Sequence, residues 1–140
     1  MSLIRFQKCK TRVTLKLFLS PSLTRHVPTD SGKDPVKLET YLTNQFRTNV
    51  VGNVHLINLF LPLILKGNVK KIIVLSSGMA DLEPTRIYNL YENPPYGIAK
   101  AALNMAVAKF SAEYAKHGVL FMSISPGVVD TGAIATSKLG

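Results

Sequence analysis

Two residues that could move a proton lie four positions apart in the segment ENPPYGIAKAALNMAVAKF, residues 92–110. A helix over this segment would place Tyr96 and Lys100 on one face. An ammonium group near a phenol favours the phenolate and lowers the phenol pKa. A phenol tuned in this way can donate a proton to a carbonyl or take one from an alcohol. The same spacing also occurs in solvent-facing pairs with apolar stems, so the pair alone does not establish a site.

The segments around this pair alternate between helix and strand. The pattern predicts a strand at 11–20, a helix at 36–66, a strand at 70–77, a loop at 78–95, a helix at 94–116 and a strand at 119–125. Gly67 is a natural cap for the first helix, Pro62 kinks or loosens its last turn, and Asn93 with two prolines is typical of a helix start. The unbroken apolar run at 72–75 predicts a strand covered on both faces. Helices between strands indicate a parallel sheet with right-handed crossovers, and so an α/β fold.

This order places several polar residues at one edge of the predicted sheet. Ligands of parallel sheets bind outside the carboxyl ends of the strands. Ser77 ends one strand at that edge, and Pro126 and Gly127 follow the next. The tyrosine–lysine pair starts its helix from the same edge. Asn49 lies in the middle of the first long helix, where asparagine has a poor propensity and usually needs a reason.

Four motifs resemble those of the short-chain dehydrogenase/reductase family. They are the pair in YGIAK, the serine in IIVLSSG, the asparagine in TNVVGNVHLINLFLPLI and the turn SPGVVDTG, in the family's order over residues 37–132. The resemblance implies a partial Rossmann-like parallel sheet with flanking long helices, the second half of a doubly wound fold. It also implies an oxidoreductase that transfers a hydride between NADP or NAD and a small carbonyl or alcohol substrate.

The resemblance assigns a role to each polar residue. Tyr96 would be the general acid and base, and Lys100 would lower its pKa and bind the nicotinamide ribose. Ser77 would hold the substrate carbonyl, with Ser76 as the neighbour that could be mistaken for it. Asn49 would position a water in a proton relay to Lys100.

The resemblance also places the nicotinamide end of the cofactor against the proline–glycine turn. Pro126, Gly127, Val129 and Thr131 would join Tyr96 and Lys100 in binding it. Val129 would act through its backbone and Thr131 through its hydroxyl.

Other family features are absent from the sequence. No G-x-G turn occurs among the nine glycines, and FLSPS stands where the family's Asn-Asn-Ala-Gly motif is expected. The chain ends just after the proline–glycine turn. We therefore expect a catalytic region truncated at both ends, and the resemblance does not establish turnover by this chain.

The serine and the tyrosine are further apart than in most members of the family. Ser77 and Tyr96 are separated by 19 positions, so the loop between them carries an insertion. Met79, Tyr88 and Tyr91 in this loop are candidates for the lining of a substrate pocket. Packing of the long loop is the alternative.

The net charge of +9 is concentrated near the N-terminus, because six basic residues precede the first acidic residue, Asp30. We divide the chain into a basic, atypical N-terminal segment with a loop, 1–35, and a partial catalytic region, 36–140. We expect a cytoplasmic protein, with a mitochondrial presequence as the alternative. No aromatic-interleaved basic face indicates nucleic-acid binding. The longest apolar run, 56–65, is about half a membrane span, so we expect no span.

The histidines and the single cysteine do not have metal-ligand spacing, and we expect no metal site. The alternative to an enzyme is a non-catalytic remnant of the family that forms a homodimer through its two long helices. A third hypothesis, a binding module with a basic tail, has less support. The apolar positions that would serve the homodimer, or simply form the core, are Val54, Ile57, Leu61, Met105 and Phe110.

Overall fold

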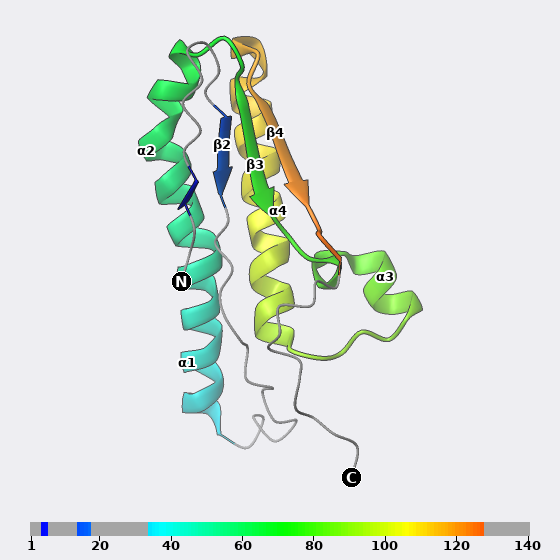
Figure 1. Cartoon of the computed structure of the whole chain (residues 1–140). Helices are drawn as coiled ribbons and strands as arrows, with labels where there is room; N and C mark the ends of the chain where they lie inside the picture. Colours follow the sequence, from blue (N-terminus) through cyan, green and yellow to red (C-terminus); the bar gives the residue numbers. More distant parts are fainter. Residues whose placement is uncertain (1–3, 6–13, 18–33, 128–140) are drawn as a thin grey trace.

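The computed structural model describes residues 4–5, 14–17 and 34–127 (Figure 1). Its elements are β1 (Ile4–Arg5), β2 (Thr14–Leu17), α1 (Pro35–Phe46), the π-helical turn η2 (Arg47–Val51), α2 (Gly52–Lys66), β3 (Lys71–Leu75), the 3-10 turn η3 (Gly78–Ala80), α3 (Leu82–Ile87), α4 (Pro94–Tyr114), the 3-10 turn η4 (Ala115–His117) and β4 (Leu120–Ile124). The predicted alternation of helix and strand is confirmed. The basic N-terminal segment lies largely outside the described residues, so its targeting role stays a prediction.

Strands β2, β3 and β4 form a parallel sheet, and the two-residue β1 pairs antiparallel with β2. The central strand is β3, in which Ile72 lies opposite Leu15 of β2 and Phe121 of β4. The segment from α1 to α2 connects β2 to β3, and α4 lies between β3 and β4 in the chain. Parallel neighbours need such crossovers, so the predicted parallel α/β arrangement is confirmed.

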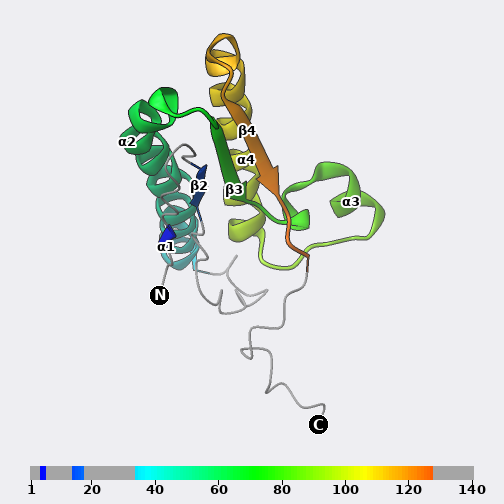
Figure 2. The same cartoon turned by 45° about the horizontal axis from the view of Figure 1, so that its top comes forward.

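The long helices pack against one face of the sheet (Figures 1 and 2). Ile72 and Val74 of β3 are buried together with Ile57 of α2 and Leu103 of α4. The other face is more open, since its residues on β4 are 38–46% exposed: Leu120, Met122 and Ile124. In β3, for which cover on both faces was predicted, Ile72 and Val74 are buried but Ile73 and Leu75 are only partly buried, so within the described residues the prediction holds for one face alone. The apolar run at 72–75 does not indicate that α2 and α4 both lie on the same side of the sheet.

The first long helix runs from Pro35 to Lys66, close to the predicted 36–66, with a π-helical turn in its middle. Asp34 caps its start by accepting a hydrogen bond from the Lys37 N–H at 3.0 Å. Gly67 ends the helix with an extended backbone, and its N–H donates to the Ile64 carbonyl. Single π-helical turns within α-helices are frequently found at functional sites, and this π-helical turn contains Asn49.

This helix is also long and apolar enough to cross a membrane, by length and composition alone. The core helix of a soluble protein passes the same test. Here Ile57, Leu61 and Ile64 are buried against the sheet and α4. The finding is thus weak evidence for a membrane span, which was not expected from the sequence.

Helix α4 begins and ends near the predicted residues. Asn93 precedes it with a left-handed backbone (φ 50°), and its side chain makes no capping hydrogen bond. The predicted start of the helix at Asn93 is confirmed, and the residue caps it through its backbone carbonyl, which accepts hydrogen bonds from the N–H groups of Tyr96 and Gly97 at 3.1 and 3.2 Å. Asparagine tolerates this left-handed backbone. At the other end Gly118, with φ 68°, follows the 3-10 turn η4.

The segment 78–95 is not the unstructured loop expected from its sequence. It contains η3 and the six-residue helix α3. Pro84 lies in the first turn of α3, where an N–H has no acceptor within the helix. Glu83 near its start and Arg86 near its end complement the helix dipole. These local preferences favour a short helix despite the proline.

Candidate active site

The first turns of α4 lie against the carboxyl end of β3. Lys100 is only 2% exposed, and its Nζ donates a hydrogen bond of 2.9 Å to the carbonyl of Leu75, the last residue of β3. This bond ties the helix to the strand end. Ser77 follows Leu75 by two residues, so the end of β3 also places this serine near the start of α4.

Burial changes the acidity of Lys100. Removal of water from the ammonium group lowers the pKa of Lys100 from its usual 10.5 to about 8. The Leu75 carbonyl accepts one of the three N–H bonds of the ammonium group. Lys100 is therefore still mainly protonated at pH 7, but it gives up its proton far more readily than an exposed lysine.

Tyr96 is half-buried and lies beside Ser77. Burial of the phenol raises the pKa of Tyr96 above 10, and the hydrogen bond with the Ser77 side chain opposes this by lowering it. The Lys100 Nζ lies 5.6 Å from the centroid of the tyrosine ring, over its face. The expected lowering of the phenol pKa by Lys100 is thus not found in this structure. The lysine is held by the Leu75 carbonyl, and burial dominates at the tyrosine.

The two serines of the motif have different surroundings. Ser77 has an extended backbone and caps η3, since its Oγ accepts a hydrogen bond of 3.3 Å from the Met79 N–H. Ser76 is 7% exposed, and its buried Oγ has no hydrogen-bond partner among the residues that the structure describes. The structure therefore brings Ser77, rather than Ser76, to the tyrosine.

Asn49 is completely buried in the π-helical turn, which packs against α4. Its Nδ2 donates to the backbone oxygen and to Oε1 of Gln45, at 3.0 and 2.9 Å. The backbone carbonyl of Asn49 accepts a hydrogen bond of 2.6 Å from Nδ2 of Asn53. The side-chain Oδ1 of Asn49 has no hydrogen-bond partner among the described residues. Within the described residues, no hydrogen bond joins Asn49 to Lys100. Asn49 thus lies near α4, which carries Tyr96 and Lys100, without a hydrogen bond to either of them, and its water relay stays a prediction.

Sequence reasoning missed the amide partners of Asn49. Gln45, Asn49 and Asn53 are each four positions apart, so they share one face of the helix. This spacing of three amides is the signal that could have found them.

The proline–glycine turn lies at the same sheet edge. Leu75 pairs with Ile124, and the Ser76 N–H donates to the Ile124 carbonyl at 2.8 Å, so the two strand ends stay together. Pro126 and Gly127 follow this end, and Gly127 has a left-handed backbone with φ 74°. The other two predicted contacts to the cofactor, Val129 and Thr131, lie outside the described residues.

The insertion forms a pocket of about 340 Å³ against α4. Met79 and Tyr91 line it, whereas Tyr88 is 71% exposed and is not among its lining residues. None of Ser77, Tyr96 and Lys100 lines this pocket either. Its link to a substrate therefore stays a prediction for Met79 and Tyr91. Within the described residues, no group of three acidic, histidine or cysteine side chains could hold a metal ion.

Comparisons with known proteins agree with the motifs. The short chain dehydrogenase family model matches residues 31–139. The chain is 59% identical over 101 residues to the short chain dehydrogenase virK of Hypocrea virens, and 47% identical over 108 residues to the short-chain dehydrogenase/reductase iacC of Pestalotiopsis fici. These matches cover 72% and 76% of this chain but only 37% and 40% of the relatives.

A solved structure shows the same fold. The NADPH-bound carbonyl reductase from chicken fatty liver superposes with a TM-score of 0.61 at 24% identity, over 78% of this chain and 44% of that protein. This likeness confirms the partial Rossmann-like α/β fold. The family match over residues 31–139, most of the chain, shows that the chain belongs to the short-chain dehydrogenase/reductase family.

Proposed function

We propose that this chain carries the acid–base part of an NAD(P)-dependent oxidoreductase that interconverts a carbonyl and an alcohol. The observation that supports this most is the placement of Tyr96 beside Ser77, with the buried Lys100 behind the ring. All three lie at the carboxyl edge of a parallel sheet, where such folds bind ligands.

Tyr96 is suited to be the proton donor in the direction of reduction. Because its pKa is raised, the phenol keeps its proton at neutral pH. When a hydride reaches the carbonyl carbon, the oxygen gains negative charge and takes the proton from the Tyr96 hydroxyl. Ser77 can donate a hydrogen bond to the same oxygen and hold it in place. In the reverse direction the phenolate accepts the proton of the alcohol.

Lys100 would supply positive charge behind the phenol. The ammonium group of Lys100 interacts with the face of the neutral Tyr96 ring, and it would stabilise the phenolate after Tyr96 has given up its proton. With one N–H bond on the Leu75 carbonyl, two remain for other acceptors, such as the hydroxyls of a ribose.

The residues fit the reactive end of a nicotinamide cofactor, which would supply the hydride. The donors of Lys100 and Tyr96, next to the left-handed turn at Gly127, form a polar edge where strand ends meet. The sequence has no acidic or basic residue on a second strand that would select between NAD and NADP. It also lacks the family's glycine-rich turn for the pyrophosphate, which both cofactors share. Since the chain spans about two fifths of the relatives' length, the whole reaction is a proposal for this chain.

A direct test measures cofactor binding and hydride transfer separately. Binding of NADH or NADPH would raise the melting temperature, and a panel of ketones would report turnover through loss of absorbance of the reduced cofactor. We expect Tyr96→Phe to retain binding and to lower turnover about 100-fold or more, since it removes only the proton donor. Tyr88→Phe, an exposed position, is the matched control. Equal turnover by Tyr96→Phe and the parent would remove Tyr96 from the mechanism.

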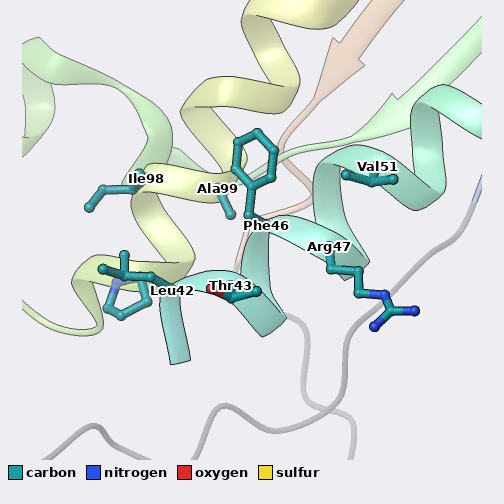
Figure 3. A pocket seen from close by; sticks show the side chains of 8 residues that line it. Leu42, Thr43, Phe46, Arg47, Val51, Ile98 and Ala99 are labelled. Atoms are coloured by element: carbon teal, nitrogen blue, oxygen red, sulfur yellow. The ribbon is translucent and has the colours of Figure 1, made fainter. Parts of the chain in front are cut away.

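A second candidate function is association through the helices without catalysis. A groove of about 460 Å³ lies between α1, η2 and the start of α4, and its lining is mainly apolar (Figure 3). Phe46 and Ile98 line it and are 46% and 56% exposed. Of the apolar positions expected to serve a homodimer, Ile57 and Leu61 belong to the core, whereas Met105 is 61% exposed. The groove and Met105 therefore support a contact with a second copy.

A further inference from the structure

Gly97, the residue after the proposed proton donor, lies against the backbone of the turn η3. A Cβ added at this position would be 2.9 Å from the carbonyl oxygen of Met79 and 3.9 Å from its carbonyl carbon and Cβ. Real Cβ atoms essentially never approach another heavy atom within 3.0 Å. Because the nearest obstacle is a backbone oxygen, rotation of a side chain cannot remove it. Either η3 or the start of α4 would have to move.

The turn that would move is the one that carries Ser77. The Met79 N–H donates to the Ser77 Oγ, and the Ala80 N–H donates to the Ser77 carbonyl at 3.0 Å. Residues 77–80 are thus one small hydrogen-bonded unit. A displacement of the Met79 carbonyl away from α4 would take the Ser77 hydroxyl away from Tyr96.

Within the described residues, no other feature requires glycine at position 97. Its backbone is helical, and the glycines with a positive φ in the described residues are Gly118 and Gly127. In the interior of a helix, glycine is less favourable than alanine. The close approach to Met79 is therefore the physical reason for a residue without a side chain at this point of α4.

We propose that Gly97 is a positioning residue, whose missing side chain lets the first turn of α4 approach η3 closely enough for the Ser77 hydroxyl to reach the Tyr96 phenol. This inference rests on the function proposed above and deepens it. The contact sets the distance between the residue that holds the carbonyl oxygen and the residue that protonates it. Gly97 itself touches neither substrate nor cofactor.

The test is a titration of the Tyr96 phenol in the full chain, by NMR of ring-labelled tyrosine, with Tyr96→Phe to assign the signal. Gly97→Ala should raise the phenol pKa above that of the parent, because burial remains and the hydrogen bond from Ser77 is lost. Gly78→Ala is the matched control. A Cβ at Gly78, in the same turn, meets nothing within 4 Å, so this variant should titrate as the parent does.

Ser77→Ala provides a second variant that leaves the glycine in place. It should raise the phenol pKa as Gly97→Ala does, and the two changes together should have no larger effect than either alone. A folded Gly97→Ala with the parent's titration, or a Ser77→Ala with the parent's titration, would overturn the proposal. If Gly97→Ala does not fold while Gly78→Ala does, the close approach is supported and Ser77→Ala decides the link to the phenol. Turnover is not measured in this titration, so a failure of the proposed function would be seen separately.

Discussion

Within the described residues no acid is bonded to the buried Lys100, so this lysine should make the protein less stable at neutral pH. We predict that Lys100→Met raises the free energy of unfolding at pH 7. Methionine has an unbranched apolar chain that can fill the space of the lysine stem. The change removes the cost of keeping an ammonium group away from water, and it also removes the hydrogen bond to the Leu75 carbonyl.

The magnitude follows from the pKa of Lys100, which is 10.5 for an ordinary lysine and about 8 here. Each pKa unit corresponds to about 1.4 kcal/mol, so the charged lysine lowers stability by about 3 kcal/mol at pH 7. The lost hydrogen bond opposes this by about 1 kcal/mol. We therefore expect Lys100→Met to be about 2 kcal/mol more stable than the parent at pH 7.

The pH dependence gives the prediction a sign. Because the pKa is lower in the folded protein, the unfolded chain binds more protons between pH 8 and 10.5. The penalty is complete below pH 8 and is relieved as the pH rises through this window. At pH 9.5 only about 1.4 kcal/mol of it remains, so the stabilities of parent and variant should nearly converge.

Urea unfolding at pH 7, 8, 9 and 9.5 measures this difference. The raised pKa of Tyr96 has the opposite sign, since its stabilising effect is lost only as the pH rises above 10, beyond this range. Lys109→Met, at an exposed position of the same helix, controls for the loss of one positive charge. A constant difference between Lys100→Met and the parent at all four pH values would refute the reasoning, as would a variant that is less stable throughout.

Two further predictions concern the core and the groove. Leu103→Ala should lower the free energy of unfolding by about 2–5 kcal/mol, because Leu103 is completely buried between α4 and the sheet. Met105→Ala, at a 61% exposed position, should change it by less than about 0.5 kcal/mol, and equal losses in denaturant titrations would contradict the packing. If the groove binds a second copy, sedimentation velocity should show a dimer that Ile98→Glu converts to a monomer. A parent that is monomeric at high concentration would exclude this association.

The fold was predictable where local chemistry decides the structure. Gly118 ends the turn η4 that follows α4, with the positive φ that glycine adopts easily, and the prolines after Asn93 mark the start of α4. Alternating helices and strands predicted the parallel order, because parallel neighbours need crossovers. The failures concern packing between distant segments. The open face of β4 could not be predicted, since an apolar run does not show which side of a sheet the helices occupy.

The proximity of Ser77, Tyr96 and Lys100 was predictable from the sequence, but their electrostatics were less so. Spacing alone placed Tyr96 and Lys100 on one face, and the strand end brought Ser77 to them. The state of the phenol depends on burial, and no motif encodes burial. The bond from Lys100 to the Leu75 carbonyl joins residues 25 positions apart, so it arises only when α4 has docked on β3. The sequence therefore indicated that Ser77, Tyr96 and Lys100 lie together, but it predicted a lowered pKa for Tyr96, whereas burial raises this pKa.

The hydrogen bond from Lys100 to Leu75 also means that the proposed acid–base residues can be arranged before the proposed cofactor binds. Strand β3 is paired on both sides, so its end is fixed by β2 and β4. That end holds Lys100 through Leu75 and carries Ser77, which reaches Tyr96. The contacts of Lys100 with Leu75 and of Ser77 with Tyr96 are made within residues 75–100, and neither needs a nucleotide. The pKa shifts of the lysine and the tyrosine should therefore be present in the chain without cofactor, because the protein alone removes water from both groups.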